Sequence, residues 1–351
     1  MKVLVTPLDW GLGHATRCVP IIHELLRQGD DVEVASSGSA LRLLQLEFSQ
    51  LEFFELPPYQ PLYSASSNLL PKLIGQGSRF LKVIEQEHRL ITDIAKARSI
   101  HTIISDHRYG CYTVGTKNVF VTHQVNFQFQ SFWKIGGGLF NSWHHRMMAA
   151  FQEIWVPDLP GSALSGDLSL NQLPACKYVG LLSRFTGPRQ QDFKYDLLVL
   201  MSGPEPQRSI FEQLMRQQVA TTNFKVLLVK GQPSLKTNSY SQHQIAEVDH
   251  LTSAELQQVI EQSEFVVCRS GYSSVMDMAR LKRRNLLFVP TPGQPEQIYL
   301  ARMLQSKGLA HYVSQDHVLL EQDLRVASTY QGFADLMEQD LLSNAVASLH
   351  S

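Results

Sequence analysis

The segment F-V-V-C-R-S-G-Y-S-S-V-M-D-M-A-R, Phe265–Arg280, decides how the second half of this chain folds. Its first four residues form an apolar run typical of a buried strand, and apolar residues recur at helical spacing from Val275. A strand that ends in a glycine turn before a helix directs free backbone N–H groups and the positive helix end at one point. The segment therefore predicts a phosphate-binding site. The alternative is an ordinary βαβ unit in which Gly271 only makes the turn.

A second strand and loop follow along the chain. Leu286–Val289 is again apolar, and the loop Pro290–Gly293 leads into a helix that opens with Glu296 and Gln297. Because polar residues follow two neighbouring strands at their carboxyl ends, we expect them to meet at one edge of an open α/β sheet, where nucleotides bind. Asp277, about one turn into the preceding helix, is placed to accept hydrogen bonds from a sugar diol.

These residues resemble the C-terminal half of glycosyltransferase family 28, which includes the MurG family and the plant galactolipid synthases. The matching residues are Arg269-Ser270-Gly271, Val275, Val289-Pro290, Gln297 and Ala301. Asp277 stands where the family has glutamate, and Leu300 where it has asparagine. The resemblance implies a GT-B fold, an α/β architecture of two Rossmann-like doubly wound domains facing across a cleft. It further implies that Asp277 holds the ribose of a UDP-sugar, and that Glu296 and Gln297 hold the donor sugar.

The resemblance extends the nucleotide-sugar site to two further loops. Ser202–Arg208 corresponds to the Gly/Ser-rich loop beside the diphosphate, and its arginine is either a phosphate ligand or part of a surface ion pair. Asp249–Ser253 corresponds to the loop that binds uracil through backbone atoms. The residues expected to bind the nucleotide sugar are Ser202, Gly203, Arg208, Leu251, Arg269, Ser270, Gly271, Ser273, Ser274, Asp277, Glu296 and Gln297.

The N-terminal segment carries a second candidate site. A strand, Lys2–Leu8, runs into the loop D-W-G-L-G-H and then into a helix, Ala15–Gln28. Two glycines let the backbone approach a ligand closely, and a histidine beside a helix N-terminus is biased toward the neutral form that a general base needs. His14 is therefore the candidate base, with a loop-pinning role as the alternative. An NAD site is excluded because Thr16 replaces the third glycine of that motif.

Other polar residues follow neighbouring strands of the same domain. Asp106 comes directly after the strand Thr102–Ser105 and is the rival to His14 as the catalytic base. His123 follows another strand and is either a site residue or an ordinary loop residue. A glycine-rich loop ending in Gly-His is also found in family 28, and the form Gly11–Arg17 resembles the UDP-sugar hydrolase of pseudaminic acid synthesis. The residues expected on the acceptor side are Gly11, Gly13, Arg17 and His123.

Composition limits the class of protein. The chain has 351 residues, of which 44% are hydrophobic and 18% charged, enough for two domains with large cores. A net charge of −1 argues against binding of nucleic acid through its phosphates. The four cysteines lie far apart without metal-ligand spacing and read as reduced thiols. The chain enters a strand directly after Met1-Lys2 and has no apolar run long enough to cross a bilayer, so we expect a cytoplasmic protein.

The expected domain boundaries follow from these elements. Residues 1–157 form the acceptor domain, 158–189 a linker, 190–332 the nucleotide-sugar domain, and 333–351 a C-terminal helix that crosses back to the first domain. The segments 59–82 and 127–151 combine aromatic and basic residues. Each is either part of the core or a surface that docks on anionic lipid.

Together these features predict an inverting transfer of a sugar from a UDP-sugar to a hydroxyl acceptor, lipid-linked and reached at the cytoplasmic membrane face. No D-x-D motif occurs, so neither a metal nor a cofactor beyond the UDP-sugar substrate is expected, and backbone N–H groups would stabilise the departing UDP. Two alternatives stay open. One is a UDP-sugar hydrolase of the same fold, in which water replaces the acceptor, and the other is a non-catalytic sugar-nucleotide-binding protein.

Overall fold

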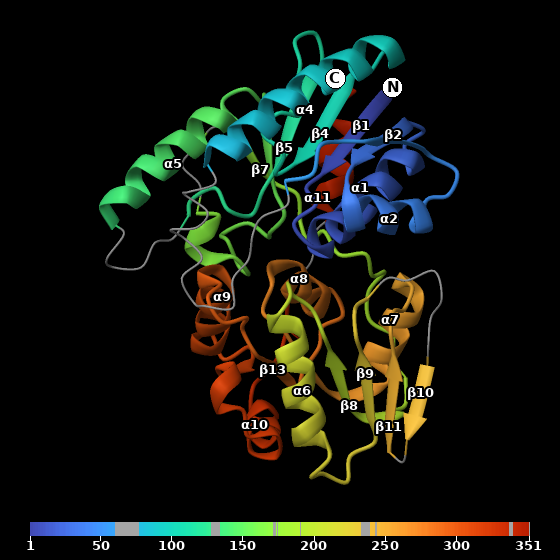
Figure 1. The fold of residues 1–351 in the computed structure, drawn as a ribbon, viewed down its shortest axis with the longest axis vertical. Coiled ribbons are helices and arrows are strands. Elements are labelled where there is room, and N and C mark those ends of the chain that lie inside the picture. The colour runs from blue at the N-terminus through green and yellow to red at the C-terminus, as the bar shows by residue number, and fades with distance from the viewer. Residues whose placement is uncertain are drawn as a thin grey trace. The chain divides into compact units, whose positions relative to one another are not determined.

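The computed structural model describes residues 1–59, 77–127, 134–170, 173, 175–189, 191–232, 239–242, 244–336 and 340–350. The chain divides into two compact units. The first contains the described residues up to Ser183 together with residues 340–350, and the second contains the described residues from Arg184 to residue 336. Each unit is built on one sheet with helices around it (Figure 1).

The sheet of the first unit is parallel, with the strand order β3-β2-β1-β4-β5-β6-β7. Its elements in chain order are β1 Lys2–Pro7, α1 Leu12–Arg27, β2 Asp31–Ser36, α2 Gly38–Glu47, β3 Glu52–Glu55, α4 Gly77–Arg98, β4 Thr102–Asp106, β5 Lys117–Val121, α5 Lys134–Met148, β6 Glu153–Val156, the 3-10 turn η2 Gly166–Leu168, β7 Cys176–Tyr178 and α11 Leu341–Ala347.

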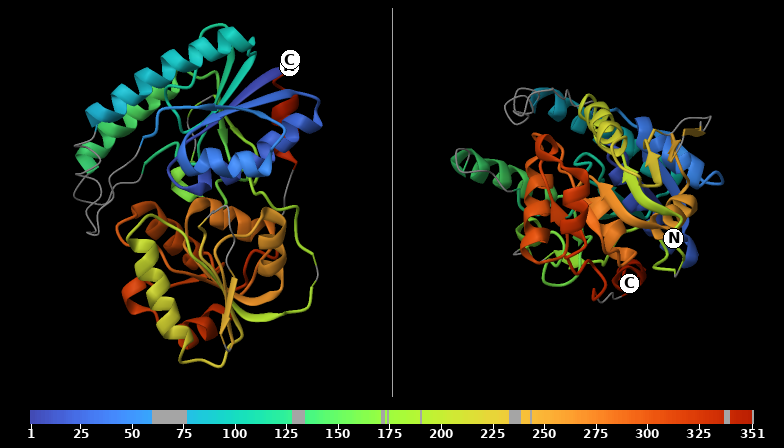
Figure 2. Two further views of the ribbon diagram at one scale, coloured as in Figure 1. Left: turned by 45° about the vertical axis from the view of Figure 1, so that its right-hand side comes forward. Right: turned by 90° about the horizontal axis from the view of Figure 1, so that it is seen from below.

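Helices cover both faces of this sheet. Strands β1, β4 and β5 are buried over almost their whole length, as expected for central strands of a parallel sheet. The apolar side of α4 packs on one face through Ile91, Ile94 and Ala95. Helices α4 and α5 lie side by side in both views, and their side chains share an apolar cluster (Figures 1 and 2). Helix α1 packs on β1 and β2 and contacts α2 and α11.

The second unit repeats the plan with the strand order β10-β11-β9-β8-β12-β13-β14. All neighbouring strands are parallel except the hairpin β10–β11. The elements are β8 Tyr195–Leu200, α6 Gln207–Val219, β9 Val226–Val229, β10 Ser239–Gln242, β11 Ile245–Val248, α7 Ser253–Glu261, β12 Ser263–Cys268, α8 Tyr272–Arg280, β13 Leu286–Phe288, α9 Pro295–Ser306, β14 His311–Tyr312, η3 Gln315–His317 and α10 Leu320–Ala327.

Strand order reverses once near the middle of each sheet. In the first, the chain leaves β1 for β2 on one side and returns to β4 on the other. In the second, it leaves β8 for β9 and returns to β12. The loops at the carboxyl ends of the two strands that flank a reversal diverge, and ligands of open α/β sheets bind there. Both candidate sites in the sequence fall at such a point.

Two parts of the fold differ from the sequence-based expectation. The predicted linker begins with residues 158–183, which belong to the first unit, because β7 pairs with β6 and the buried Asp158 carboxylate accepts the backbone N–H of Ser165 at 2.9 Å. The predicted helix 333–351 is the shorter α11, held against α1 where Nη2 of Arg27 donates to Oγ of Ser343 at 3.0 Å. None of the described helices is long and apolar enough to cross a membrane.

A buried arginine ties together the loops that follow the first three strands. Nε of Arg108 donates to the Pro7 carbonyl at 2.8 Å, and Nη2 donates to Oγ of Ser37 at 2.7 Å. Nη1 donates to the Glu87 carboxylate and to the Pro57 carbonyl. The side chains of Arg108 and Glu87 are both fully buried, so the Glu87 charge depends on Arg108 for compensation, whereas Arg108 also pairs with Asp9 at 3.4 Å.

Replacing Glu87 with alanine should destabilise the first unit by about 3–5 kcal/mol, the usual cost of leaving one member of a buried ion pair without its partner. Urea unfolding followed by tryptophan fluorescence measures this unit selectively, because all four tryptophans precede residue 184. Glu85→Ala is the matched control on the exposed side of α4, where the ion pair with Arg89 should contribute less than about 0.5 kcal/mol. Equal stability of the two variants would contradict the structural role of Arg108.

Candidate active site

The first candidate site begins where β1 passes into α1. Gly11, the residue before the helix, has φ 81° and ψ 176°, a conformation that is essentially restricted to glycine. Helix α1 starts at the next residue, so Gly13 and His14 lie in its first turn. Arg17 follows His14 by three residues and therefore projects from the same side of the helix. The glycine thus sets the angle at which this pair faces the sheet edge.

The structure brings four predicted residues of three separate segments together at this edge. Asp106 is the last residue of β4, and its Oδ1 lies 3.1 Å from Nδ1 of His14. Arg17 donates to both oxygens of Asp106, with a distance of 2.7 Å from Nε to Oδ2. Its Nη1 donates to Nδ1 of His123, in the loop after β5, at 3.0 Å, and its Nη2 lies 2.7 Å from Nδ1 of His14.

Burial and charge set the protonation states in this cluster. Asp106 is fully buried, which alone would raise its pKa, but the Arg17 charge and His14 outweigh burial and hold the pKa of this carboxyl well below its usual range. Burial and the neighbouring Arg17 charge lower the pKa of His14 below 6.5, so the imidazole is neutral at pH 7. His14 keeps 15% side-chain exposure, whereas Asp106 has none. Only the histidine of this pair is open to a substrate.

His107, which was not among the predicted site residues, also belongs to the cluster. Its ring centroid lies 5.4 Å from that of His14, and Nε2 contacts Oγ1 of Thr122 at 2.6 Å. Burial and the nearby His14 lower the pKa of His107 well below its ordinary value. Its backbone has φ 60°, a left-handed conformation that costs about 1–3 kcal/mol in a residue other than glycine. The sequence signal for including His107 in the site was its position directly after Asp106, at the carboxyl end of β4.

Ligand atoms of His14, Asp106 and His107 lie within 4.8 Å of one another, a spacing that suits a metal ion. The donors are already engaged, however. Arg17 donates to both Asp106 oxygens, and its Nη2 lies against Nδ1 of His14. A cation at this point would meet the guanidinium charge. We therefore interpret the cluster as a proton-transfer site rather than a metal centre.

In the second unit, three loops meet at the carboxyl edge of β8, β12 and β13. A Cβ on Gly203, which has φ 105°, would lie 3.4 Å from Oγ1 of Thr291, so the first and third loops touch. Oγ of Ser270 donates to the Gln297 carbonyl at 2.8 Å, which ties the second loop to α9. The Gln297 side chain accepts the Thr291 backbone N–H at 2.8 Å. Ser202, which precedes Gly203, is half-buried.

Arg269 differs from its predicted role as a nucleotide ligand. Its guanidinium is buried and lies 4.0 Å over the Phe211 ring. Nη1 donates to the Val289 carbonyl at 3.0 Å, and Nη2 donates to Oε1 of Gln315 at 2.6 Å. Burial lowers the pKa of Arg269 to about 9. The residue therefore connects the loops from within the unit. Gln297 does the same through its hydrogen bond with Thr291.

The start of α8 is partly exposed at this edge. Gly271 precedes the helix and supplies no side-chain cap, while Ser273 and Ser274 in the first turn are half-buried. Asp277 lies just over one turn further along and is 9% exposed. Glu296 occupies the first turn of α9 and is half-buried. These residues stay candidates for contact with a nucleotide sugar.

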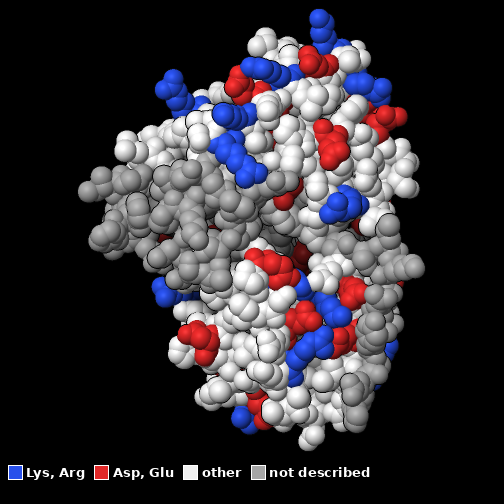
Figure 3. All heavy atoms as spheres, viewed as in Figure 1, with Lys and Arg blue, Asp and Glu red and all other residues white. Residues whose placement is uncertain are grey.

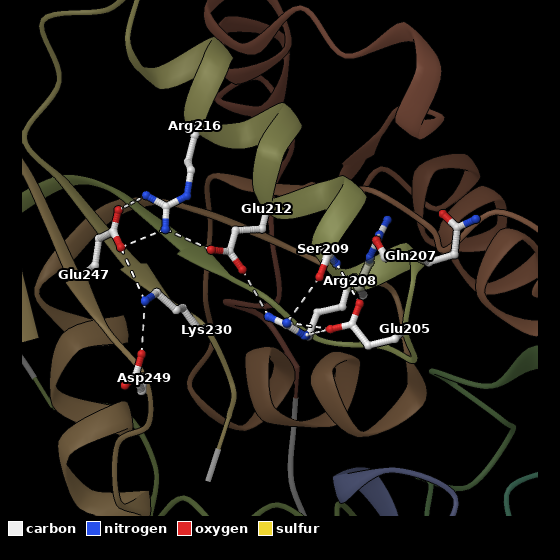
Figure 4. A network of polar contacts seen from close by, with 10 residues as sticks. Glu205, Gln207, Arg208, Ser209, Glu212, Arg216, Lys230, Glu247 and Asp249 are labelled. Carbon is white, nitrogen blue, oxygen red and sulfur yellow. Dashed lines mark hydrogen bonds and ion pairs between the residues drawn. The ribbon is translucent and has the colours of Figure 1, made fainter. Parts of the chain in front are cut away.

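Arg208, predicted either to bind phosphate or to form a surface ion pair, is part of an ion-pair network (Figure 4). Its Nε donates to Oε1 of Glu205 at 2.8 Å and its Nη1 to Oε2 of Glu212 at 3.1 Å. The network continues through Arg216 and Glu247 to Lys230 and Asp249. Of the two roles predicted for Arg208, the structure shows the ion pair. Leu251 is half-buried, in the loop before the capping box of α7.

The second aromatic segment forms α5, with residues 128–133 outside the described part, and the first falls mostly on residues 60–76, which are also outside it. One side of α5 is core. His144 is buried, donates from Nε2 to the Gln124 carbonyl at 2.8 Å and accepts the Tyr109 hydroxyl at Nδ1. The other side exposes Leu139 and Phe140. One side of the helix is therefore core, and docking of the exposed side on lipid stays a prediction.

Comparison with known proteins agrees with this architecture. Residues 203–330 match the family model described as the glycosyltransferase family 28 C-terminal domain. No curated protein matches the chain. Solved structures with similar folds include the glycosyltransferase of kitacinnamycin, with 13% identity and a TM-score of 0.65 over 99% of this chain and 93% of that chain. MurG of Acinetobacter baumannii has 12% identity and a TM-score of 0.55 over 99% and 94%.

The glycosyltransferase VinC, solved in complex with dTDP, has 12% identity and a TM-score of 0.58 over 100% of this chain and 98% of that chain. Identities this low establish the fold alone. The chain thus has the GT-B fold, and residues 203–330 carry the match to the family 28 C-terminal domain.

Proposed function

We propose that the protein transfers a sugar from a UDP-sugar to a hydroxyl acceptor, with inversion at the anomeric carbon. The observation that carries the proposal is the contact between neutral His14 and buried Asp106, at the point where the strand order of the first sheet reverses. The family 28 match over residues 203–330 supports a nucleotide sugar as the donor. The VinC complex with dTDP makes thymidine the second nucleoside to test.

In this mechanism His14 is the general base. The acceptor hydroxyl gives its proton to the imidazole while its oxygen attacks the anomeric carbon. The bond from that carbon to the β-phosphate oxygen breaks, and the nucleoside diphosphate leaves with the electron pair. Asp106 is unsuited to the same task, because it has no exposed surface and Arg17 donates to both of its oxygens. It stabilises the imidazolium that forms instead.

The donor contacts are assigned to the second unit. Asp277 holds the ribose, Glu296 faces the donor sugar, and backbone N–H groups at the start of α8 stabilise the diphosphate. Helix α8 supports the assignment of the diphosphate. Its first turn has no acidic residue that would repel an anion, and no side chain caps the helix. No metal or cofactor takes part in this mechanism.

Hydrolysis is the second candidate, because the loop Gly11–Arg17 as a whole resembles the UDP-sugar hydrolase of pseudaminic acid synthesis. Arg17 belongs to the cluster around Asp106, so the resemblance includes the site itself. One experiment distinguishes the candidates and the non-catalytic alternative. Release of nucleoside diphosphate is measured with a panel of UDP- and dTDP-sugars, with and without lipid extract and with EDTA throughout. Transfer requires the acceptor, hydrolysis does not, and a binding protein releases nothing.

The acceptor is proposed to be lipid-linked, at the cytoplasmic face of the membrane. Figure 3 shows several Lys and Arg side chains, with Asp and Glu side chains among them, over the part of the molecule that α4 occupies in Figure 1. Arg79 and Lys82 are exposed on that helix beside the exposed Leu81. Basic residues near an anionic surface contribute about 1 kcal/mol each to attraction. Together with Leu139 on α5 they form a candidate lipid-facing surface.

The lipid-facing surface is tested by Leu139→Asp. The side chain is 75% exposed, so the change should leave stability nearly unaltered while weakening binding to anionic vesicles by about 2 kcal/mol, the transfer free energy of one leucine side chain. Leu46→Asp is the matched control on α2, at 62% exposure. Co-sedimentation at low salt measures the difference. Equal binding by wild type and both variants removes this surface from the proposal.

Asp277→Ala should weaken UDP binding by about 1–3 kcal/mol, the range for a lost hydrogen bond to a charged group. Titration calorimetry with the full chain measures the affinity. Asp316→Ala removes an exposed carboxylate elsewhere in the second unit and should leave the affinity unchanged. Unchanged affinity in Asp277→Ala would show that the ribose is bound by other residues.

His14→Ala should lower turnover by about 10²–10⁴-fold, the usual share of general-base catalysis, while UDP affinity stays at the wild-type value. Because the pKa of His14 is lowered, wild-type turnover should rise with pH through a midpoint below 6.5, where the imidazolium loses its proton. Asp106→Asn should keep a rising limb, since His14 is still present. An active His14→Ala beside an inactive Asp106→Asn would assign the base to the aspartate.

A further inference from the structure

Nδ1 of His14 makes two contacts that exclude each other. Nη2 of Arg17 lies 2.7 Å from this nitrogen, and Oδ1 of Asp106 lies 3.1 Å from it. An arginine N–H only donates, so the first contact requires a lone pair on Nδ1. A carboxylate only accepts, so the second requires a proton there. A single nitrogen satisfies one condition at a time, and the contacts correspond to the two tautomers of the neutral ring.

The geometry favours the tautomer in which Arg17 donates. Its contact is the shorter of the two, at 2.7 Å against 3.1 Å. If Nδ1 carried a proton, two N–H groups would face each other across that shorter distance. Asp106 has no need of the histidine proton, because Arg17 donates to both of its oxygens and the Cys18 thiol points at Oδ2 from 3.7 Å.

Arg17 is held firmly in this position. Its side chain is 2% exposed, and Nη1 donates to Nδ1 of His123 at 3.0 Å. The other titratable ring against His14 is His107, whose Nε2 is engaged with Thr122. Nδ1 of His14 contacts Arg17 and Asp106, so the competition for that atom is between these two side chains.

We propose that Arg17 is a positioning residue that sets the tautomer of His14, keeping the proton on Nε2 in the protein without substrate. The inference rests on the proposed function, in which His14 accepts a proton at Nε2. That step needs the other tautomer, with the Nδ1 proton donated to Asp106. To reach this second tautomer, the ring loses the Nε2 proton to solvent and gains a proton from solvent at Nδ1. The hydrogen bond from Arg17 Nη2 to Nδ1 breaks at the same time. Arg17 thus makes the base tautomer the minor one until its contact opens.

Long-range ¹H–¹⁵N correlation spectra of the full chain, labelled at histidine nitrogens, test the proposal directly. The His14 signals are assigned by their loss in His14→Gln. In the wild type, Nε2 should appear as the protonated nitrogen and Nδ1 as the unprotonated one. In Arg17→Met the pattern should reverse, since the carboxylate of Asp106 then accepts a hydrogen bond from a protonated Nδ1. Arg27→Met, on an exposed part of the same helix, should keep the wild-type pattern.

A wild-type spectrum with the proton on Nδ1 overturns the proposal, and so does an unchanged pattern in a folded Arg17→Met. If that variant does not fold, because Asp106 is left as an uncompensated buried charge, Asp106→Asn replaces it. There Arg17 still donates to Nδ1, and the proton should stay on Nε2. A proton on Nδ1 in this variant would contradict the control by Arg17.

The pH dependence provides a second readout that a purely structural role would not move. Burial and the Arg17 charge lower the pKa of His14, so Arg17→Met, which removes the charge, should shift the rising limb of turnover to higher pH. An unmoved limb in an active Arg17→Met overturns the electrostatic part of the inference. The spectra can be recorded on an inactive protein, so they test the tautomer control by Arg17 independently of the general-base role of His14. A fully active His14→Ala refutes the base and leaves the tautomer result standing, whereas a wild-type Nδ1 proton refutes only the control by Arg17.

Discussion

Parallel pairing of the strands is the constraint on which both candidate sites depend. Parallel neighbours need long crossover connections, so residues that are far apart in sequence reach the same edge of the sheet. In the first unit β1, β4 and β5 are neighbours, and the segments after them bring His14, Asp106 and His123 together. In the second unit β8, β12 and β13 do the same for Gly203, Ser270 and Thr291. The chemistry of each edge is then decided by which side chains it collects.

At the edge of the first unit, the consecutive residues Asp106, His107 and Arg108 include two buried charges of opposite sign that pair in different directions. Asp106 pairs with Arg17 on one side, and Arg108 pairs with Glu87 on the other. His107, between the two charged residues, has the left-handed backbone value φ 60°. Buried charges are tolerated only when they are paired, so the strained backbone and the two ion pairs support one another. A single strand end thereby both braces the loops and prepares the proton-transfer site.

The sequence predicted most strands of both sheets, because central parallel strands are continuous apolar runs, as in Val3–Val5 and Leu197–Val199. It also predicted that His14, Asp106 and His123 lie at one edge, because each follows the carboxyl end of a strand, and it placed Arg17 on the same side as part of the segment Gly11–Arg17. It missed the hairpin β10–β11, because the sequence of β10, Ser-Tyr-Ser-Gln, is polar, and it missed the structured part of the supposed linker. Pairing across the fold could not be inferred either: nothing local links Arg108 to Glu87, which lies on a different element.

Arg269 shows why residue type was a poor guide in the second unit. An arginine after a strand suggests a phosphate ligand, but the direction of its side chain is decided by the packing around Phe211, which a motif does not contain. Arg208 is likewise paired, with Glu205 and Glu212, and Lys230 with Glu247 and Asp249. An anion at this edge would have to break such pairs to reach these cations. We therefore keep the backbone N–H groups at the start of α8, where no acidic residue lies in the first turn, as the proposed partners of a diphosphate.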